Sequence, residues 1–334
     1  MRRDERPHEG GTIRSRPRRV SGARSTPSIT VAAMTAAPAP PVLADAAVDA
    51  VLAWYDAHAR DLPWRMPGAS PWGILVSEIM LQQTPVVRVL PRWIAWMERW
   101  PEPRDLAEAP TADVLRAWDS LGYPRRALRL QECARTIVGE HGGVVPSTVE
   151  ELRALPGIGE YTAGAVAAFA FGRRAMVADT NVRRVVERAL AGRALPRPHL
   201  TAAERHVLTA QVPVDTQRSV RWNQAVMELG ALVCTARSPA CEACPLAAHG
   251  CAYLAAGRPA PIAGDRRTQA FEGTDRQMRG RIMKALREAH PRSVATTALL
   301  SLDESDRARV ERCIASLVAD RLAVMADDAL RLPA

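Results

Sequence analysis

The chain has 334 residues, of which 47% are hydrophobic, so it is long enough for two or three domains with cores of their own. It contains no uninterrupted apolar run of the roughly 18 residues that a membrane span requires, and its arginine-rich N-terminus lacks the apolar stretch of a secretory signal. The net charge of +9 favours a polyanionic partner, although residues 1–30 alone supply +5 of it through eight arginines against three acids. We expect a cytoplasmic protein that binds no membrane.

Composition changes along the chain. Residues 1–44 are rich in Arg, Pro, Ser, Gly and Ala without apolar periodicity, which predicts a disordered tail, and Met34 within it is an alternative candidate for the start of the protein. Residues 45–258 carry apolar residues at helical spacing and almost no strand-like alternation, which predicts an all-α body. Residues 259–276 contain two prolines and a polar stretch, as expected for a linker.

Residues 277–334 predict a small winged-helix-like α+β domain. The expected elements are helices over Gln277–His290, Thr296–Leu300 and Asp303–Ala319, and a hairpin of Leu322–Met325 and Ala329–Leu332. Several of its arginines are candidates for contacts with DNA phosphates, and an ordinary solvated surface is the alternative. These arginines are Arg279, Arg281, Arg307, Arg309 and Arg312.

Two helical patterns, Thr148–Ala154 and Glu160–Phe171, flank the short segment Leu155–Gly159. Its two glycines, Gly157 and Gly159, permit positive φ angles and a close approach of the backbone. The second helix begins at once, so its free N–H groups suit a phosphate oxygen. This pattern is typical of a helix-hairpin-helix that binds the DNA backbone, and a tight turn without a ligand is the alternative.

Four of the six cysteines lie within 18 residues: Cys234, Cys241, Cys244 and Cys251. In a cytosolic chain such a cluster indicates metal more often than disulfides. Four thiolates can hold a cubane iron–sulfur cluster or a zinc ion, but the gaps of six, two and six residues differ from the paired spacing of a zinc ribbon.

From about Val48 to Leu254 the chain resembles the MutY-type adenine DNA glycosylases of the endonuclease III superfamily. The matching stretches are Leu62–Arg65, Ser77–Thr84, Leu121–Tyr123, Leu155–Gly159, Val177–Arg183 and Asn223–Cys234. The resemblance implies a two-lobed helical fold, with a barrel of about residues 72–182 and a cluster lobe formed by 45–71 and 183–258. It also implies a 4Fe-4S cluster held by the four cysteines, although the last gap in the family has five residues and here has six.

Two carboxylates carry the implied chemistry. Glu78 lies in an apolar helical run, so we expect burial to raise its pKa and keep a proton available, with a solvent-facing glutamate as the alternative. The resemblance makes it the acid that protonates adenine. Asp179 is placed as a helix N-cap, whose position favours the ionised form. The resemblance adds that it stabilises the oxocarbenium ion and that Asn181 orients the site.

Tyr161 separates two branches of the superfamily. Enzymes that resemble endonuclease III have a lysine there, which forms a Schiff base and cuts the strand. This chain has a single lysine, Lys284, far from that position in the sequence. We therefore expect a monofunctional glycosylase that leaves an abasic site.

The resemblance also assigns residues that contact DNA and the extruded base. The side chains that would enter or wedge the base stack are Gln83, Thr84, Leu121 and Tyr123. Core packing is the alternative for Leu121 and Tyr123. The residues that would bind phosphate are Gly157 and Gly159. The adenine pocket would contain Trp64, Arg65, Leu81 and Gln224. Most family members also carry a Nudix-like sheet domain that reads 8-oxoguanine, and residues 263–334 are too short and too helical for it.

The expected substrate is double-stranded DNA in which adenine is mispaired with 8-oxoguanine or guanine, bound by a monomer associated with the nucleoid. Two alternatives remain. An endonuclease III-type pyrimidine glycosylase would need the missing lysine for its lyase step. A non-catalytic iron–sulfur DNA-binding regulator would explain the charge and the cysteines, but not Glu78, Asp179 and the hairpin together.

Overall fold

The computed structural model describes residues 39–262 and 271–334. Met34, most of the predicted tail and part of the predicted linker lie outside the described residues. Pro40–Ala334 form one compact unit, and its division into a body of residues 45–258 and a domain of residues 277–334 stays a prediction. In the described part of the chain, no helix is long and apolar enough to span a bilayer.

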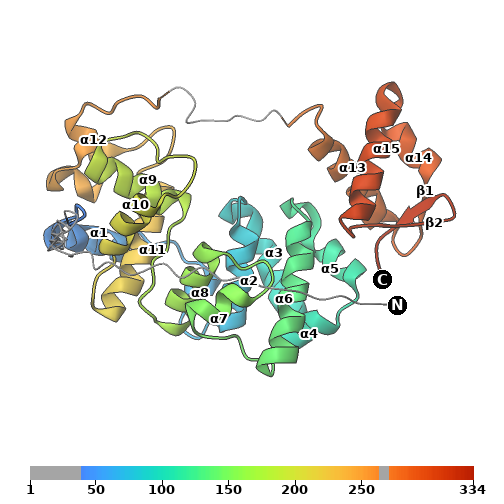
Figure 1. Ribbon diagram of the computed structural model, residues 1–334, viewed down its shortest axis with the longest axis horizontal. Coiled ribbons are helices and arrows are strands. Elements are labelled where there is room, and N and C mark those ends of the chain that lie inside the picture. The colour runs from blue at the N-terminus through green and yellow to red at the C-terminus, as the bar shows by residue number, and fades with distance from the viewer. Residues whose placement is uncertain (1–38, 263–270) are drawn as a thin grey trace, which may run out of the picture. The chain divides into compact units, whose positions relative to one another are not determined.

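Residues 45–258 fold as helices joined by short loops, as the apolar periodicity predicts (Figure 1). The helices are α1 (Asp45–His58), α2 (Pro71–Leu81), α3 (Val86–Arg99), α4 (Pro103–Glu108), α5 (Thr111–Trp118), α6 (Arg125–His141), α7 (Val149–Ala154), α8 (Glu160–Phe171), α9 (Thr180–Val186), α10 (Ala202–Ala210), α11 (Thr216–Leu232) and α12 (Ala252–Ala255). α1 begins where the periodicity begins, and α8 covers the range expected from the sequence.

Two large groups of buried side chains organise these helices. α2 to α8 contribute to the first, which includes Leu75 and Leu130, and α1 with α9 to α11 forms the second, which includes Val51 and Val226. α1 packs against α11, and α11 packs against α9, so the N-terminal helix joins helices from the far end of the body. The ring of Trp64 packs edge-on against Trp93 and belongs to the first group.

Residues 274–334 form the predicted small α+β fold, with helices α13 (Asp275–Ala289), α14 (Thr296–Leu300) and α15 (Arg307–Ala319) and strands β1 (Val294–Ala295), β2 (Val324–Ala326) and β3 (Ala329–Arg331). The antiparallel sheet has the order β1-β3-β2, and β1, with two residues, was too short to predict. The third helix starts four residues later than predicted, because the Asp306 side chain caps it at the Arg309 N–H. Asp327 and Asp328 both have positive φ and form the hairpin turn.

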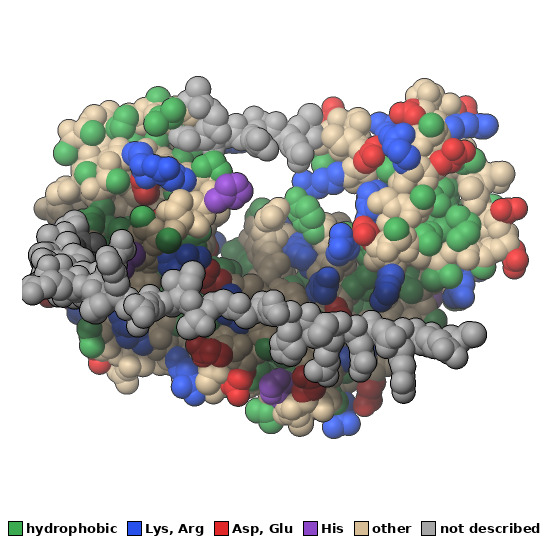
Figure 2. Space-filling view, viewed as in Figure 1, with side chains coloured by type: hydrophobic (Ala, Val, Ile, Leu, Met, Phe, Trp, Pro, Cys, Tyr) green, Lys and Arg blue, Asp and Glu red, His purple; other side chains and the backbone are tan. Residues whose placement is uncertain are grey.

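Some of the arginines that we considered for phosphate contacts form ion pairs within this domain. Arg279 pairs with Asp320 at 2.6 Å, and Arg309 pairs with Asp303. Figure 2 shows basic and acidic side chains intermixed over this domain. The arrangement favours the alternative of an ordinary solvated surface for these two arginines, because their charges are already balanced locally.

Candidate active site and cluster site

A large cavity of about 970 Å³ is lined by residues of α2, α8, α9 and α11. This volume lies at the upper end of the roughly 300–1,000 Å³ found for small-molecule sites, so an extruded nucleoside fits. All residues predicted for catalysis, DNA contacts and the adenine pocket line it, except Leu121 and Tyr123. They are Trp64, Arg65, Glu78, Leu81, Gln83, Thr84, Gly157, Gly159, Tyr161, Asp179, Asn181 and Gln224.

Glu78 is buried because its helix is buried on every side. The Ser70 hydroxyl caps α2 by accepting the Gly73 N–H at 3.0 Å, and every residue from Trp72 to Met80 is buried. Glu78 itself is only 4% exposed, so the predicted burial is confirmed. Burial raises its pKa to about 7, which leaves a substantial protonated fraction near neutral pH.

Tyr161 lies on α8 with its hydroxyl pointed at this carboxyl. The hydroxyl donates a hydrogen bond to Oε2 of Glu78 at 2.8 Å. This bond lowers the pKa of Glu78, and so does the charge of Arg65, whereas the charge of Asp179 raises it. Burial raises the pKa of Tyr161 well above its ordinary value, so the phenol stays a neutral donor.

Asp179 is the N-cap of α9, as the sequence predicts. Its Oδ1 accepts the Val182 N–H at 2.6 Å, and its Oδ2 accepts a hydrogen bond from the Asn181 amide at 2.7 Å. Asn181 in turn accepts from Arg184 at 2.8 Å, so three side chains form one chain of hydrogen bonds. We expected the helix N-terminus to favour ionisation, and the N–H bonds do lower the pKa. Burial nevertheless outweighs them and raises the pKa of Asp179.

Two charged residues that the sequence analysis did not single out complete the cavity wall. Glu228 on α11 is buried and accepts two hydrogen bonds from the Arg60 guanidinium, at 2.6 and 2.8 Å, and one from Arg65 at 2.9 Å. Burial raises the pKa of Glu228, but these bonds outweigh it and lower the pKa to about 2. The sequence contained a signal for the burial of Glu228, because this residue, like Glu78, interrupts an apolar run.

The residues expected to enter DNA divide into exposed and buried ones. Gln83 is exposed and Tyr123 is 39% exposed, and both have positive φ, of 56° and 47°. Thr84 and Leu121 are buried, and the Thr84 hydroxyl lies 3.3 Å from the Leu121 carbonyl oxygen, to which it donates. The core-packing alternative therefore describes Leu121, whereas the side chains of Gln83 and Tyr123 are exposed, with the Arg276 guanidinium 4.3 Å from the centre of the Tyr123 ring.

The predicted hairpin joins α7 to α8. Gly157 has φ +79°, and a Cβ there would lie 2.9 Å from Cβ of Arg129, so both the angle and the space require glycine. Gly159, by contrast, has an ordinary negative φ. The first residue of α8, Glu160, is held by Arg205 through two bonds of 2.7 and 2.8 Å, which balances its charge beside the expected phosphate position.

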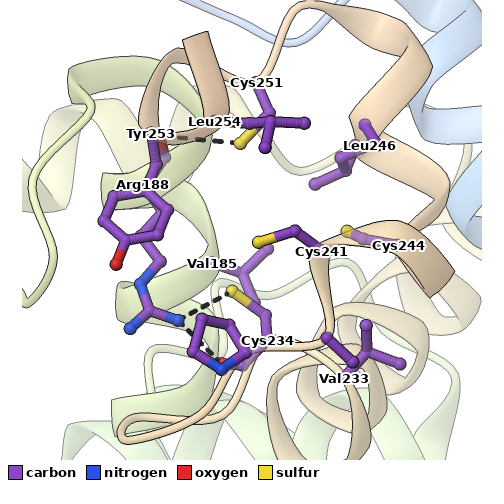
Figure 3. A pocket seen from close by; sticks show the side chains of 13 residues that line it. Val185, Arg188, Val233, Cys234, Cys241, Cys244, Leu246, Cys251, Tyr253 and Leu254 are labelled. Atoms are coloured by element: carbon purple, nitrogen blue, oxygen red, sulfur yellow. Dashed lines mark hydrogen bonds between the residues drawn. The ribbon is translucent and has the colours of Figure 1, made fainter. Parts of the chain in front are cut away.

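The four clustered cysteines line a second cavity with otherwise mainly apolar walls, including Val185, Val233 and Leu254 (Figure 3). Among the described residues, no three His, Cys, Asp or Glu side chains converge on the position of one ion. Four thiolates around a mainly apolar cavity fit a cluster in which each iron takes one thiolate. Cys251 reaches this cavity despite the longer last gap.

Arg188 and Arg184 connect the cysteine cavity to its surroundings. Arg188 is 2% exposed, donates to Sγ of Cys234 at 3.3 Å, and lies over the ring of Tyr253 (Figure 3). Arg184 donates to the carbonyl oxygen of Cys234 at 2.8 Å and also holds Asn181. The second arginine thus links the cluster segment to the hydrogen-bond chain of Asp179.

The cysteine cavity predicts that the purified protein is yellow-brown and contains four irons. A Cys251→Ser variant should lose most of its absorbance near 400 nm (roughly where thiolate-bound clusters absorb), because one iron loses its thiolate. Iron analysis and the visible spectrum measure this, and Cys133→Ser, at a cysteine outside the cavity, is the control. Stoichiometric zinc in the wild-type protein would contradict the prediction.

Comparisons with known proteins agree with this geometry. The family model described as HhH-GPD superfamily base excision DNA repair protein matches residues 76–211, and the iron–sulfur binding domain of endonuclease III matches 234–249. The second match includes three of the four cysteines and ends before Cys251. The chain therefore has the iron–sulfur binding segment in which endonuclease III-like proteins carry a 4Fe-4S cluster.

Individual relatives are similar over most of the described body. An adenine DNA glycosylase of Mycobacterium tuberculosis is 51% identical over 281 residues, which cover 81% of this chain and 88% of the relative. The human adenine DNA glycosylase is 45% identical over 204 residues, covering 59% of this chain and 37% of the human protein. The solved structure of a thermostable thymine-DNA glycosylase superposes with a TM-score of 0.55 at 29% identity, covering 62% of this chain and 95% of that one.

The same body carries the buried Glu78 with its tyrosine partner, the N-cap Asp179, the hairpin and the cysteine cavity, and the two family models match residues 76–211 and 234–249 of it. The chain belongs to the adenine DNA glycosylase family of the helix-hairpin-helix base excision repair superfamily.

Proposed function

We propose that this enzyme hydrolyses the N-glycosidic bond of adenine that is mispaired with 8-oxoguanine or guanine in double-stranded DNA. One observation carries the proposal: Glu78, an acid with a pKa of about 7, shares a cavity with Asp179, the N-cap of α9, whose carboxyl accepts the Val182 N–H and the Asn181 amide. Cleavage of a glycosidic bond commonly uses two carboxyl groups in opposite roles, one protonated and one ionised.

Glu78 serves as the general acid. Tyr161 donates its hydroxyl hydrogen to Oε2, so in the neutral acid the carboxyl proton resides on the other oxygen and is free to move to adenine N7. The purine then leaves as a neutral base, which lowers the barrier to bond cleavage. Burial is what makes this proton available near neutral pH, since an exposed glutamate would be ionised.

Asp179 serves as the group that offsets the positive charge of the oxocarbenium ion. The Val182 N–H and the Asn181 amide bind one oxygen each, so the carboxylate has a fixed orientation before substrate arrives. Asn181 acts by orienting Asp179, and Arg184 holds Asn181 from behind. Water then completes the hydrolysis at the sugar.

The reaction ends at the abasic site. The group beside Glu78 is the phenol of Tyr161, and the only lysine is Lys284, so the cavity offers no side-chain amine for a Schiff base. This feature separates the proposed activity from that of a pyrimidine glycosylase with a lyase step.

DNA is held by backbone contacts and entered by exposed side chains. The hairpin at Gly157 binds a phosphate through the free N–H groups at the start of α8. Gln83 and Tyr123 enter the duplex, and Trp64, Arg65, Leu81 and Gln224 surround the extruded adenine. We propose that the enzyme works as a monomer on DNA in the nucleoid.

The test is a single-turnover assay on matched duplexes that carry A opposite 8-oxoguanine, A opposite G, A opposite T and T opposite G. We expect adenine release from the first two, an intact strand until alkali is added, and no adduct trapped by borohydride. Release of thymine in preference to adenine would support a pyrimidine glycosylase instead. A protein that binds these duplexes and releases no base would be a regulator.

A further inference from the structure

Arg126, the second residue of α6, contacts two loops that the proposed function brings to DNA. One loop follows α2 and contains Gln83, and the other precedes α6 and contains Tyr123. The Arg126 guanidinium lies beneath both of them, next to the rings of Trp118 and Tyr123 at 5.1 and 5.7 Å. Burial lowers the pKa of Arg126 to about 10, and the group is still charged at neutral pH.

The two terminal nitrogens of Arg126 share their N–H bonds among six acceptors. Nη1 donates to the carbonyl oxygens of Ile79, Met80 and Gln82, at 3.0, 3.0 and 2.6 Å. Nη2 donates to the Thr84 hydroxyl at 2.9 Å and to the carbonyl oxygens of Leu121 and Gly122 at 3.3 and 3.1 Å. Each nitrogen thus serves chiefly one loop, and the rigid guanidinium plane fixes the spacing between them.

The acceptors on α2 are carbonyls of its last turn, and that of Ile79 also accepts the Gln82 N–H at 3.4 Å. A cation there also complements the negative end of the helix dipole. The first of these carbonyl groups belongs to Ile79, the residue after Glu78. The guanidinium that joins the two loops therefore also binds the C-terminal end of the helix that carries the acid.

Gln83 and Tyr123 both adopt positive φ angles, which cost energy for side chains other than glycine. Arg126 binds Gln82 and Thr84 on either side of Gln83, and Leu121 and Gly122 directly before Tyr123. The hydrogen bond from the Thr84 hydroxyl to the Leu121 carbonyl oxygen adds one direct link between the loops. The two exposed side chains are therefore presented by loops that cannot move independently.

We propose that Arg126 is a positioning residue that couples the Gln83 loop to the Tyr123 loop, so that the two side chains enter the duplex as one unit. This inference rests on the proposed function, because it assigns these two residues to base extrusion. It predicts that loss of Arg126 slows base removal without weakening the phosphate contacts that give affinity for undamaged duplex.

The test is a double-mutant cycle of Gln83→Ala and Tyr123→Ala, measured as single-turnover adenine release in the wild-type and in the Arg126→Met background. In the wild type we expect non-additive effects, with a coupling of at least about threefold in rate. In Arg126→Met the effects should become additive, the rate should fall about tenfold or more, and Kd for undamaged duplex should stay within about twofold. Arg135→Met, an exposed arginine on the same helix, is the control and should keep the coupling.

Arg126→Lys provides the second background if the methionine variant does not fold, as judged by the 400 nm absorbance and Tm. A lysine keeps the charge but has three donors on one nitrogen and cannot span both loops, so partial loss of coupling is expected. Unchanged coupling between Gln83 and Tyr123 in either folded variant would overturn the inference. The proposed function would still stand in that case, provided that the wild type releases adenine. A wild-type protein that releases no adenine would instead overturn the proposed function.

Discussion

Replacement of Glu78 by glutamine is expected to abolish adenine release while leaving the affinity for duplex DNA within about twofold. A positioned general acid contributes roughly 10²–10⁴-fold to a rate, and the amide cannot supply the proton. Affinity should persist because phosphate contacts at the hairpin do not involve this side chain. Single-turnover rates and duplex binding measure the two effects. Glu132→Gln, an exposed glutamate on α6, is the control and should retain both.

The wild-type rate should also depend on pH in a defined direction. The active form of Glu78 is protonated, and its pKa of about 7 lies above its ordinary value of 4.5. The single-turnover rate should therefore be highest below about pH 7 and fall as the pH rises through that value, by about tenfold for each further pH unit. A rate that rises across the same interval would remove Glu78 from the role of acid.

The same residue should lower the stability of the fold in alkaline solution. A carboxyl whose pKa is raised on folding costs stability above its unfolded pKa, and the cost grows between 4.5 and about 7. The full shift corresponds to roughly 3 kcal/mol. Glu78→Gln should consequently be more stable than the wild type at pH 8, with a smaller difference at pH 5. Equal differences in Tm at the two pH values would contradict a raised pKa.

Replacement of Glu228 by glutamine is expected to destabilise the protein by about 3–5 kcal/mol, since it leaves two guanidinium groups with no carboxylate between them. The Glu228 side chain is 1% exposed, and it joins α11 to the segment that leads into α2. Urea unfolding at pH 7 measures the loss. Glu160→Gln is a matched control, because Glu160 binds Arg205 with similar distances but at the surface, where about 1 kcal/mol or less is expected.

The contribution of Glu228 to the stability of the fold depends on pH with the opposite sign to that of Glu78. The pKa of Glu228 is lowered from 4.5 to about 2, so its stabilisation is present above 4.5 and is lost as the pH falls through about 2. The loss of unfolding free energy in Glu228→Gln should therefore stay constant between about pH 6 and pH 8. A deficit that disappears within this interval would show that the carboxylate is not held by Arg60 and Arg65.

Local patterns in the sequence determined much of this protein. The apolar periodicity predicted the all-α body and the range of α8, because helix formation and burial follow from neighbours along the chain. Burial of Glu78 followed from its apolar neighbours, and the N-cap of α9 followed from the position of Asp179. The cysteine spacing predicted the metal segment, and the identity of Tyr161 predicted the branch of the superfamily.

The tertiary structure alone decided which of these residues act together. Glu228 meets Arg60 and Arg65 from more than 160 positions away, and no local pattern encodes that pairing. The structure also decided that Gln83 and Tyr123 are exposed while Thr84 and Leu121 are buried, because exposure depends on the packing of two loops rather than on residue type. Arg126 is one of 44 arginines in the sequence, and its burial beneath both loops is visible in the structure but not in the sequence.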